Sequence, residues 1–393
     1  MTTMPRAWDE LRGRGAAVRE RNRQVVPYAV SDQAITVPAV SVEEAVGDGY
    51  TIVDVRAPSE FAAGHVPGAL NLPLLADGQR AVVGRTYRDG GPRDARMAAL
   101  DLVSQELPEY LRSLKVVASR SDRLGVMCWR GGERSRNVVL LLGLIGVRAV
   151  QVLGGYKAYR RWVLDGLDAW HPEIPVVTLY GHTGAGKTAL LRALRGVRSE
   201  RCRPTVIDLE GLALHRGSLL GGLHQPGVRT QKQFDALVWD ALRTAAGDYL
   251  VVEGEGGKIG HIFLPGTVSE LVRGGVPVLV TASPEARAER ILREYAPELW
   301  TADDEARFRS SLELIGARMP ASTLAALSAA FDDGRFYDVV RGLLESYYDP
   351  LYQRSSVEGR EFASVFETGE DAAGDARRLA ACLASVVTSY TGR

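Results

Sequence analysis

The sequence contains little cysteine. Its 393 residues include three, Cys128, Cys202 and Cys382, which lie far apart in the chain. A disulfide-stabilised domain or a zinc cluster needs more cysteines at closer spacing, so neither is expected. A few scattered thiols are typical of a reducing compartment, where one of them can stay reactive. We therefore expect a cytoplasmic protein.

The sequence also lacks a charge excess and a long apolar run. Lys and Arg together number 48, as do Asp and Glu, so the formal net charge is zero. Any RNA contact must then come from local basic patches. No apolar run approaches the ~18 residues of a membrane helix, and the N-terminus lacks the apolar segment of a signal peptide. With 46% apolar and 24% charged residues, we expect a soluble globular protein without a membrane partner.

What the sequence does contain is a phosphate loop. The motif Gly181-His182-Thr183-Gly184-Ala185-Gly186-Lys187-Thr188 fits G-x-x-x-x-G-K-[ST]. An apolar run at 176–180 predicts a buried strand before it, and the apolar residues after Thr188 predict a helix. Backbone N–H groups and the helix N-terminus would hold a phosphate, with a charge from Lys187 and a hydroxyl from Thr188. The candidate phosphate-binding residues are Gly181, Thr183, Gly184, Gly186, Lys187 and Thr188. The alternative is a glycine-rich turn that binds nothing.

A second loop surrounds Cys128. Strands and helices alternate from residue 35 to 153, which predicts an open parallel sheet with ligands beyond the carboxyl ends of its strands. The apolar strand 124–127 ends at Cys128, and a helix is predicted over 138–144. Arg130, Arg134 and the helix N-terminus favour a thiolate, so Cys128 is the candidate catalytic nucleophile. The alternative is an inert buried cysteine, which is the interpretation we give Cys202 and Cys382.

Residues 35–165 resemble a rhodanese domain. The resemblance is carried in order by Asp54-Val55-Arg56, Glu60-Phe61, Gly64-His65-Val66-Pro67-Gly68-Ala69 and the Cys128 loop. In that family the loop cysteine carries a chalcogen atom as a persulfide or its selenium analogue.

Residues 156–162 interleave basic and aromatic side chains. Such a segment can stack unpaired bases beside cations. It can equally be an amphipathic helix whose aromatic rings pack inward, and both interpretations stay open. Residues 1–30 are rich in arginine and form a basic extension, either a solvated helix or an arm that touches a polyanion.

The second half predicts a P-loop α/β domain with a helical C-terminal region. Two predicted strands, 205–211 and 249–255, end in acidic residues, among them the carboxylates Asp208 and Glu253. Either could hold a metal near the phosphates or act as acid or base; the alternative is a solvated strand end. The expected organisation is a basic extension (1–30), a rhodanese-like domain (31–165), a linker (166–174), a P-loop domain (175–358) and a helical tail (359–393).

Over nearly its whole length the chain resembles the bacterial tRNA 2-selenouridine synthases. The specific matches are Cys128-Trp129-Arg130-Gly131-Gly132-Glu133-Arg134-Ser135, Gly154-Gly155-Tyr156-Lys157-Ala158-Tyr159-Arg160, the phosphate loop, Asp208-Leu209-Glu210-Gly211-Leu212-Ala213, His215-Arg216-Gly217-Ser218 and Lys258-Ile259-Gly260. The resemblance implies a transferase that replaces sulfur by selenium at C2 of the wobble 2-thiouridine (position 34) of tRNA. Selenophosphate would donate selenium, and geranyl diphosphate would first geranylate the sulfur.

The resemblance also implies site roles. A loop for the selenophosphate anion would comprise Arg130, Gly131, Gly132, Arg134 and Ser135, and candidate tRNA contacts are Tyr156, Lys157, Arg160, Arg216 and Lys258. No tightly bound cofactor is implied, Mg²⁺ stays open, and an enzyme that supplies selenophosphate is a candidate partner.

Three alternatives remain at this point. The first is a P-loop kinase or ATPase with a regulatory rhodanese module. The second is a tRNA sulfurtransferase that takes sulfur from thiosulfate. The third is a tRNA-binding protein without catalysis, whose function would be retained after loss of both Cys128 and Lys187.

Overall fold

The computed structural model describes residues 36–391 except 198–201, 217–228, 255 and 370. The chain divides into two units, Met1–Val37 and Pro38–Arg393, and the second contains all the helices and strands named below. The basic extension (1–30) and the motif residues Gly217 and Ser218 lie outside the described residues. Within the described part, no helix is both long and apolar enough to cross a bilayer.

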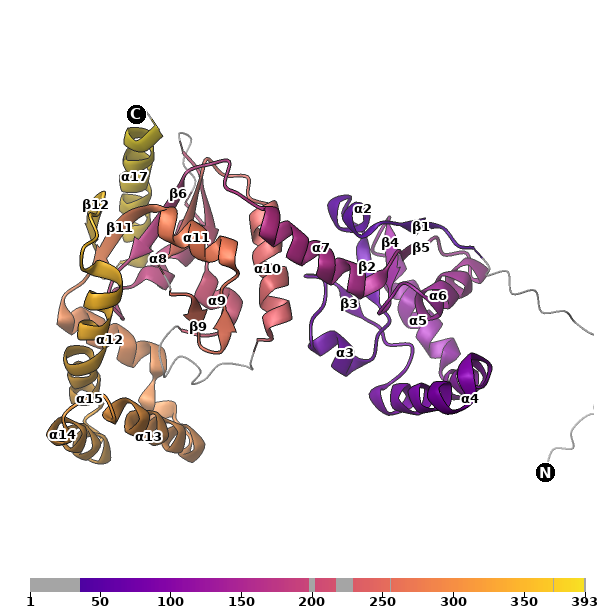
Figure 1. The fold of residues 1–393 in the computed structure, drawn as a ribbon, viewed down its shortest axis with the longest axis horizontal. Coiled ribbons are helices and arrows are strands. Elements are labelled where there is room, and N and C mark those ends of the chain that lie inside the picture. The colour runs from indigo at the N-terminus through magenta and orange to yellow at the C-terminus, as the bar shows by residue number, and fades with distance from the viewer. Residues whose placement is uncertain (1–35, 198–201, 217–228, 255, 370, 392–393) are drawn as a thin grey trace, which may run out of the picture. The chain divides into compact units, whose positions relative to one another are not determined.

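The rhodanese-like domain is built on a five-stranded parallel sheet in the order β1-β5-β4-β2-β3 (Figure 1). Its strands are β1 (Ala39–Val40), β2 (Thr51–Asp54), β3 (Leu70–Asn71), β4 (Leu124–Met127) and β5 (Val150–Val152). Its helices are α2 (Val42–Gly47), α3 (Pro58–Ala62), α4 (Asp77–Val103), α5 (Leu107–Ala118), α6 (Glu133–Leu144) and α7 (Gly155–Ala169).

Two local sequence patterns explain where these helices begin. Ser41 caps α2, and Glu44 completes a reciprocal capping box. The helical stretch 95–114 is divided between α4 and α5. The division falls where Pro108 occupies the first turn of α5, because proline suits a helix start and is disfavoured in a helix interior.

The P-loop domain has a second parallel sheet, in the order β12-β11-β6-β8-β7. Its strands are β6 (Val176–Tyr180), β7 (Pro204–Ile207), β8 (Tyr249–Glu253), β11 (Val276–Thr281) and β12 (Ser364–Glu367). The helices of this part are α8 (Lys187–Leu194), α9 (Leu209–Ala213), α10 (Gln231–Arg243), α11 (Gly266–Gly274) and α12 (Pro284–Tyr295), and a hairpin is formed by β9 (Lys258–Ile259) and β10 (Ile262–Phe263).

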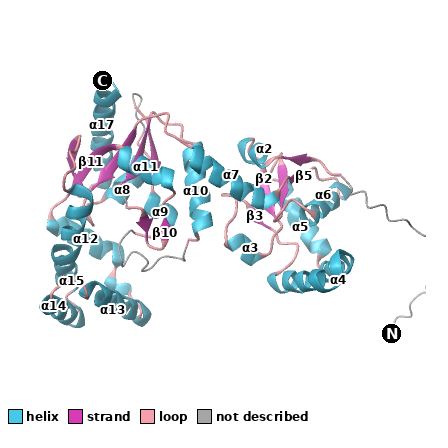
Figure 2. Cartoon of the chain, in the orientation of Figure 1, coloured by secondary structure: helices cyan, strands magenta, loops and turns pink. Residues whose placement is uncertain are grey.

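Helices cover both faces of this sheet (Figure 2). Leu250 and Val252 of β8 face the cluster that contains residues of α10 and α11, whereas Val251 faces α8 and α17 (Ala372–Thr391). Because neighbouring residues of a strand point to opposite faces, a strand buried on both sides must be apolar throughout. The continuous apolar run of β8 is therefore explained by its central position.

A helical region lies in sequence between β11 and β12. It comprises α13 (Ala302–Gly316), α14 (Ala321–Asp332), α15 (Phe336–Leu343) and α16 (Asp349–Tyr352), with π-helical turns at Leu344–Tyr348 and Gln353–Val357. These helices have their own core, in which Phe308 and Phe331 stack at 4.6 Å between ring centroids.

The predicted α/β fold class is confirmed, with one difference at the C-terminus. Residues 359–393 were expected to form a separate helical tail, yet β12 pairs with β11 and α17 packs on α8. A short edge strand such as β12 buries too few residues to show a clear alternation of apolar and polar residues in the sequence. The apolar face of α17 is visible in the sequence, but it does not indicate which element that face packs against. The segment is therefore part of the P-loop domain.

Candidate cysteine loop and phosphate cleft

Cys128 lies directly after β4, at the carboxyl end of the first sheet, and its residue is 3% exposed. The N–H of Gly132 donates to its Sγ at 3.3 Å, and the hydroxyl of Ser135 lies 3.2 Å from the same atom. The side-chain amide of buried Gln151 donates to the Ser135 hydroxyl at 2.9 Å. The Ser135 hydroxyl also lies 3.2 Å from the carbonyl of Gly132, to which it can donate. The sulfur therefore has one N–H donor, from Gly132, and a hydroxyl neighbour that can turn its proton toward an anionic sulfur or selenium.

A double glycine holds this loop in place. The N–H of Tyr156 donates to the carbonyl of Cys128 at 2.8 Å, and the N–H of Lys157 donates to that of Trp129 at 2.9 Å. A Cβ atom at Gly155 would lie 2.1 Å from the Cys128 carbonyl oxygen, and Gly155 has a φ of 57°. Only glycine meets both requirements. The cysteine motif and the Gly154-Gly155 motif, separate in the sequence, thus form one structure.

The two arginines of the loop have different surroundings. Arg130 is exposed, whereas Arg134 forms an ion pair with Glu60 at 2.8 Å. Burial raises the pKa of Glu60, but the hydrogen bond and charge of Arg134, the Ala57 N–H and the charge of Arg80 together outweigh it, so the pKa lies below its usual value. Arg134 therefore has a structural partner, and Arg130 is the arginine of this loop that faces solvent.

The phosphate loop connects β6 to α8 at the centre of the second sheet. The chain runs from β6 outward to β7 and returns through β8 to β11, so the loop lies where the strand order reverses, the usual ligand site of such sheets. Gly186 adopts a φ of 93° just before α8 and so lets the chain turn into the helix. Lys187 donates to the carbonyl of Gly181 at 2.5 Å.

The loop opens into a cleft of about 1730 Å³, open solvent included, whose lining has an excess of positive charge. The lining contains two carboxylates, Glu210 and Glu294, and five cationic side chains, those of Lys187, Arg192, Arg216, Arg290 and Arg293. Thr183, Gly184, Gly186 and Thr188 of the loop also line it, so most of the residues predicted to bind phosphate meet at this one place. A cleft with this concentration of positive charge suits a polyanion such as a diphosphate.

The carboxylates near the phosphate loop contact different partners. Asp208 caps α9 by accepting from the N–H of Gly211 at 2.6 Å and also pairs with Arg192 at 3.1 Å. Glu253 is fully buried and accepts from the N–H of Glu210 at 3.1 Å. The carboxylate that contacts the loop hydroxyl is that of Glu210, which accepts from Thr188 at 2.8 Å.

Glu210 was not singled out in the sequence, although the pair Asp208 and Glu210 at the end of β7 was visible there. The described residues contain no group of three His, Cys, Asp or Glu that could hold a metal ion. The oxygens of Thr188 and Glu210 nevertheless fit Mg²⁺, which is usually bound by one or two carboxylates together with substrate phosphates.

The candidate tRNA contacts differ in their surroundings. Tyr156 is 2% exposed and its ring lies 3.9 Å from the Arg56 guanidinium, which favours inward packing over base stacking for this residue. Arg160 pairs with Asp235 at 2.6 Å. Lys157 and Lys258 are exposed. Arg216 belongs to the phosphate cleft, where it pairs with Glu294 at 2.8 Å.

The region around α16 holds the phosphate loop in a way that the sequence did not indicate. Arg287, which is 5% exposed, donates to the carbonyl of Thr183 at 2.8 Å and to both carboxylate oxygens of Asp349 at 2.9 and 2.5 Å. The N–H of Gly181 donates to the hydroxyl of Tyr352 at 2.7 Å. Burial, with Arg287 and Lys187 nearby, lowers the pKa of His182. The tyrosine-rich segment 347–352 was noticeable in the sequence, but its distance from the loop hid this contact.

Comparisons with known proteins agree with both domains. The family described as "tRNA 2-selenouridine synthase AAA domain" matches residues 174–378, and "Rhodanese-like domain" matches 39–161. A tRNA 2-selenouridine synthase of Cupriavidus necator is 35% identical over 347 residues, covering 79% of this chain and 90% of that protein. The chain belongs to the tRNA 2-selenouridine synthase family.

Other members of the family give the same result. One from Cronobacter sakazakii is 35% identical over 338 residues, covering 78% of this chain and 86% of that protein. One from a Sulfurovum species is 31% identical over 327 residues, covering 77% and 87%. The resemblance stated from the motifs is therefore confirmed for the family and for its two domains.

Proposed function

We propose that this protein is a tRNA 2-selenouridine synthase that uses selenophosphate and geranyl diphosphate. It would replace sulfur by selenium at C2 of the wobble 2-thiouridine (position 34), through an S-geranylated intermediate. The observation that carries the proposal is the presence, in one chain of this family, of a thiol loop with an N–H donor and a hydroxyl beside the sulfur and a phosphate cleft lined by five cationic side chains.

Geranylation makes the later exchange feasible. A thiocarbonyl sulfur is a poor leaving group, but alkylation turns it into a thiolate that can depart. In the first step the sulfur of the thiouridine attacks C1 of geranyl diphosphate, the C1–O bond breaks, and diphosphate leaves with the electron pair. The N3 proton of the base is released to water, so the product carries an N3=C2 double bond.

The phosphate cleft is the proposed site of this first step. Lys187 and the arginines of the cleft would balance the charge that develops on the leaving diphosphate. If Mg²⁺ accompanies the diphosphate, it would neutralise part of its charge, and Thr188 and Glu210 would hold it.

The cysteine loop is the proposed site of selenium transfer. The thiolate of Cys128 attacks C2, and the geranyl thiolate leaves with the electron pair of its bond to C2. The selenium of selenophosphate then attacks C2 and releases Cys128. Water cleaves the P–Se bond, phosphate leaves, and N3 takes up a proton to give 2-selenouridine. The Gly132 N–H and the Ser135 hydroxyl would stabilise the anionic chalcogen, and exposed Arg130 would attract the selenophosphate anion.

A reconstituted reaction tests the proposal. Purified full-length protein is incubated with tRNA containing wobble 2-thiouridine, with selenophosphate and geranyl diphosphate added singly and together, and the nucleosides are identified by mass spectrometry. We expect geranylated uridine with geranyl diphosphate alone and 2-selenouridine when both are present, without ATP.

Other outcomes would support the alternatives. Nucleotide hydrolysis that Cys128→Ser leaves unchanged, without modified uridine, would favour a P-loop kinase or ATPase with a regulatory rhodanese module. Transfer of sulfur from thiosulfate to tRNA would favour a sulfurtransferase. If neither modified nucleoside forms, the proposed function is wrong; if ATP hydrolysis is required, the assignment of the phosphate loop to geranyl diphosphate is wrong.

A further inference from the structure

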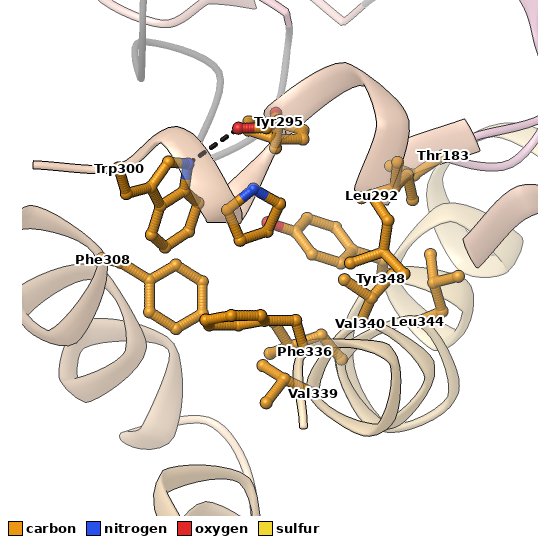
Figure 3. Close-up of a pocket in the computed structure, with 13 residues that line it drawn as sticks. Thr183, Leu292, Tyr295, Trp300, Phe308, Phe336, Val339, Val340, Leu344 and Tyr348 are labelled. Atoms are coloured by element: carbon orange, nitrogen blue, oxygen red, sulfur yellow. Dashed lines mark hydrogen bonds between the residues drawn. The ribbon is translucent and has the colours of Figure 1, made fainter. Parts of the chain in front are cut away.

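An apolar cavity adjoins the phosphate cleft. It has a volume of about 560 Å³, including its open mouth, and it is lined by side chains of α12, α13, α15 and the adjoining turns (Figure 3). Its walls are formed chiefly by Leu292, Trp300, Phe308, Phe336, Val340 and Leu344. A cavity lined almost entirely by carbon atoms is suited to a hydrocarbon ligand.

The cavity and the cleft share part of their walls. Thr183, Ile291, Tyr295 and Tyr348 line both of them, and Thr183 belongs to the phosphate loop itself. Figure 3 shows Thr183 near Leu344 at one end of the cavity, with Trp300 and Phe308 at the other. A ligand with its phosphates on the loop can therefore extend an apolar chain toward Trp300.

Aromatic rings dominate the far end of the cavity. The Trp300 ring lies 5.2 Å from that of Phe308 and 6.1 Å from that of Phe336, measured between centroids. The Trp300 N–H donates to the carbonyl of Tyr295 at 2.7 Å, which fixes the indole and leaves its carbon surface to the cavity. The base of a nucleotide would lose its hydrogen bonds to water against such walls, whereas the double bonds of a prenyl chain lose nothing.

We propose that this cavity binds the hydrocarbon chain of the prenyl diphosphate and limits its length. The proposal rests on the proposed function, because it assigns the chain of that function's substrate to a named part of the fold. Phe336 sets the available depth, and Val340 sets the width near the middle. The phosphate loop then supplies affinity for the diphosphate, and the cavity supplies selectivity for the chain.

Direct binding measurements test this without tRNA. Isothermal titration of the full-length protein compares pyrophosphate, geranyl diphosphate (C10) and farnesyl diphosphate (C15). Val340→Phe fills the cavity, and Phe336→Ala deepens it. Leu314→Phe on α13 and Tyr337→Ala on α15 are matched controls, because these residues are 69% and 40% exposed and do not line the cavity.

We expect the wild type to bind geranyl diphosphate at least tenfold more tightly than pyrophosphate. Val340→Phe should lose about tenfold in affinity for geranyl diphosphate, the equivalent of ~1.4 kcal/mol, with its pyrophosphate affinity unchanged. Phe336→Ala should shift the preference toward farnesyl diphosphate by a similar factor, and both controls should match the wild type. Circular dichroism verifies that each variant is folded.

Two results would overturn the inference. One is equal affinity of the wild type for pyrophosphate and geranyl diphosphate. The other is an unchanged order of affinities in both cavity variants. If geranylation of tRNA occurs nonetheless, the proposed function stands and the chain binds elsewhere. Conversely, chain-selective binding that responds to the variants, without any modification of tRNA, supports the cavity and contradicts the proposed function.

Discussion

The cysteine loop and the phosphate cleft differ in the space that they offer a ligand. Cys128 is 3% exposed and its loop is closed by contacts with the Gly154-Gly155 segment, so it offers little more than one sulfur and its donors. The phosphate cleft has a volume of about 1730 Å³, open solvent included, and adjoins an apolar cavity. The first site suits the handling of one atom, and the second suits a whole molecule with a charged end and a hydrocarbon end.

The largest effect is expected from removing the sulfur. Cys128→Ser should reduce selenation by at least about 10³-fold, as loss of a nucleophile usually does, and leave geranylation intact. Nucleoside mass spectrometry measures both products. Cys202→Ser and Cys382→Ser are matched controls and should behave as the wild type. Equal loss of both products in Cys128→Ser would mean that the two sites do not divide the chemistry.

A slightly smaller effect is expected in the cleft. Lys187→Ala removes a charge that would face the leaving diphosphate, so geranylation should fall about 10²–10³-fold. Selenation of tRNA that is already geranylated should continue, and Lys115→Ala on α5 is the control. If the variant loses selenation of geranylated tRNA as well, the phosphate loop also serves selenophosphate.

The two arginines of the cysteine loop are expected to differ in role, Arg130 in substrate use and Arg134 in stability. Arg130→Ala should weaken selenophosphate use about tenfold, because a charge-assisted contact to the anion is lost, without a change in stability. Arg134→Ala breaks the part-buried pair with Glu60 and should lower the free energy of unfolding by about 1–3 kcal/mol. Steady-state kinetics and urea unfolding separate the two roles. If Arg134→Ala unfolds like the wild type, its pair with Glu60 contributes little.

The smallest effect concerns pH. Burial lowers the pKa of His65, His182 and His215, so the folded state binds fewer protons than the unfolded state near the ordinary histidine pKa of about 6.5. Their contribution to stability is present above that pH and is lost as the pH falls toward the lowered values. The melting temperature should decline between pH 7 and 5, and the decline should be shallower when all three are replaced by Gln. Identical slopes would contradict this assignment.

Much of the fold followed from local patterns. The strands β4, β6 and β8 coincide closely with the expected segments, because an apolar run acts within a few residues. The edge strand β12 and the break between α4 and α5 were not expected. The position of β12 depends on its pairing with β11, which is distant in sequence. The break between α4 and α5 spans only a few residues, so it does not disturb the helical periodicity of the sequence.

The sequence alone determined the two loops, the α/β class and the family, because each loop is a contiguous motif whose chemistry is local. Tertiary structure decided which groups surround those loops. It joined Gly155 to Cys128, gave Thr188 the carboxylate of Glu210, tied the phosphate loop to α16 through Arg287, and placed an apolar cavity beside it. These contacts join residues that are up to 104 positions apart, so only the packing of the folded chain could bring them together.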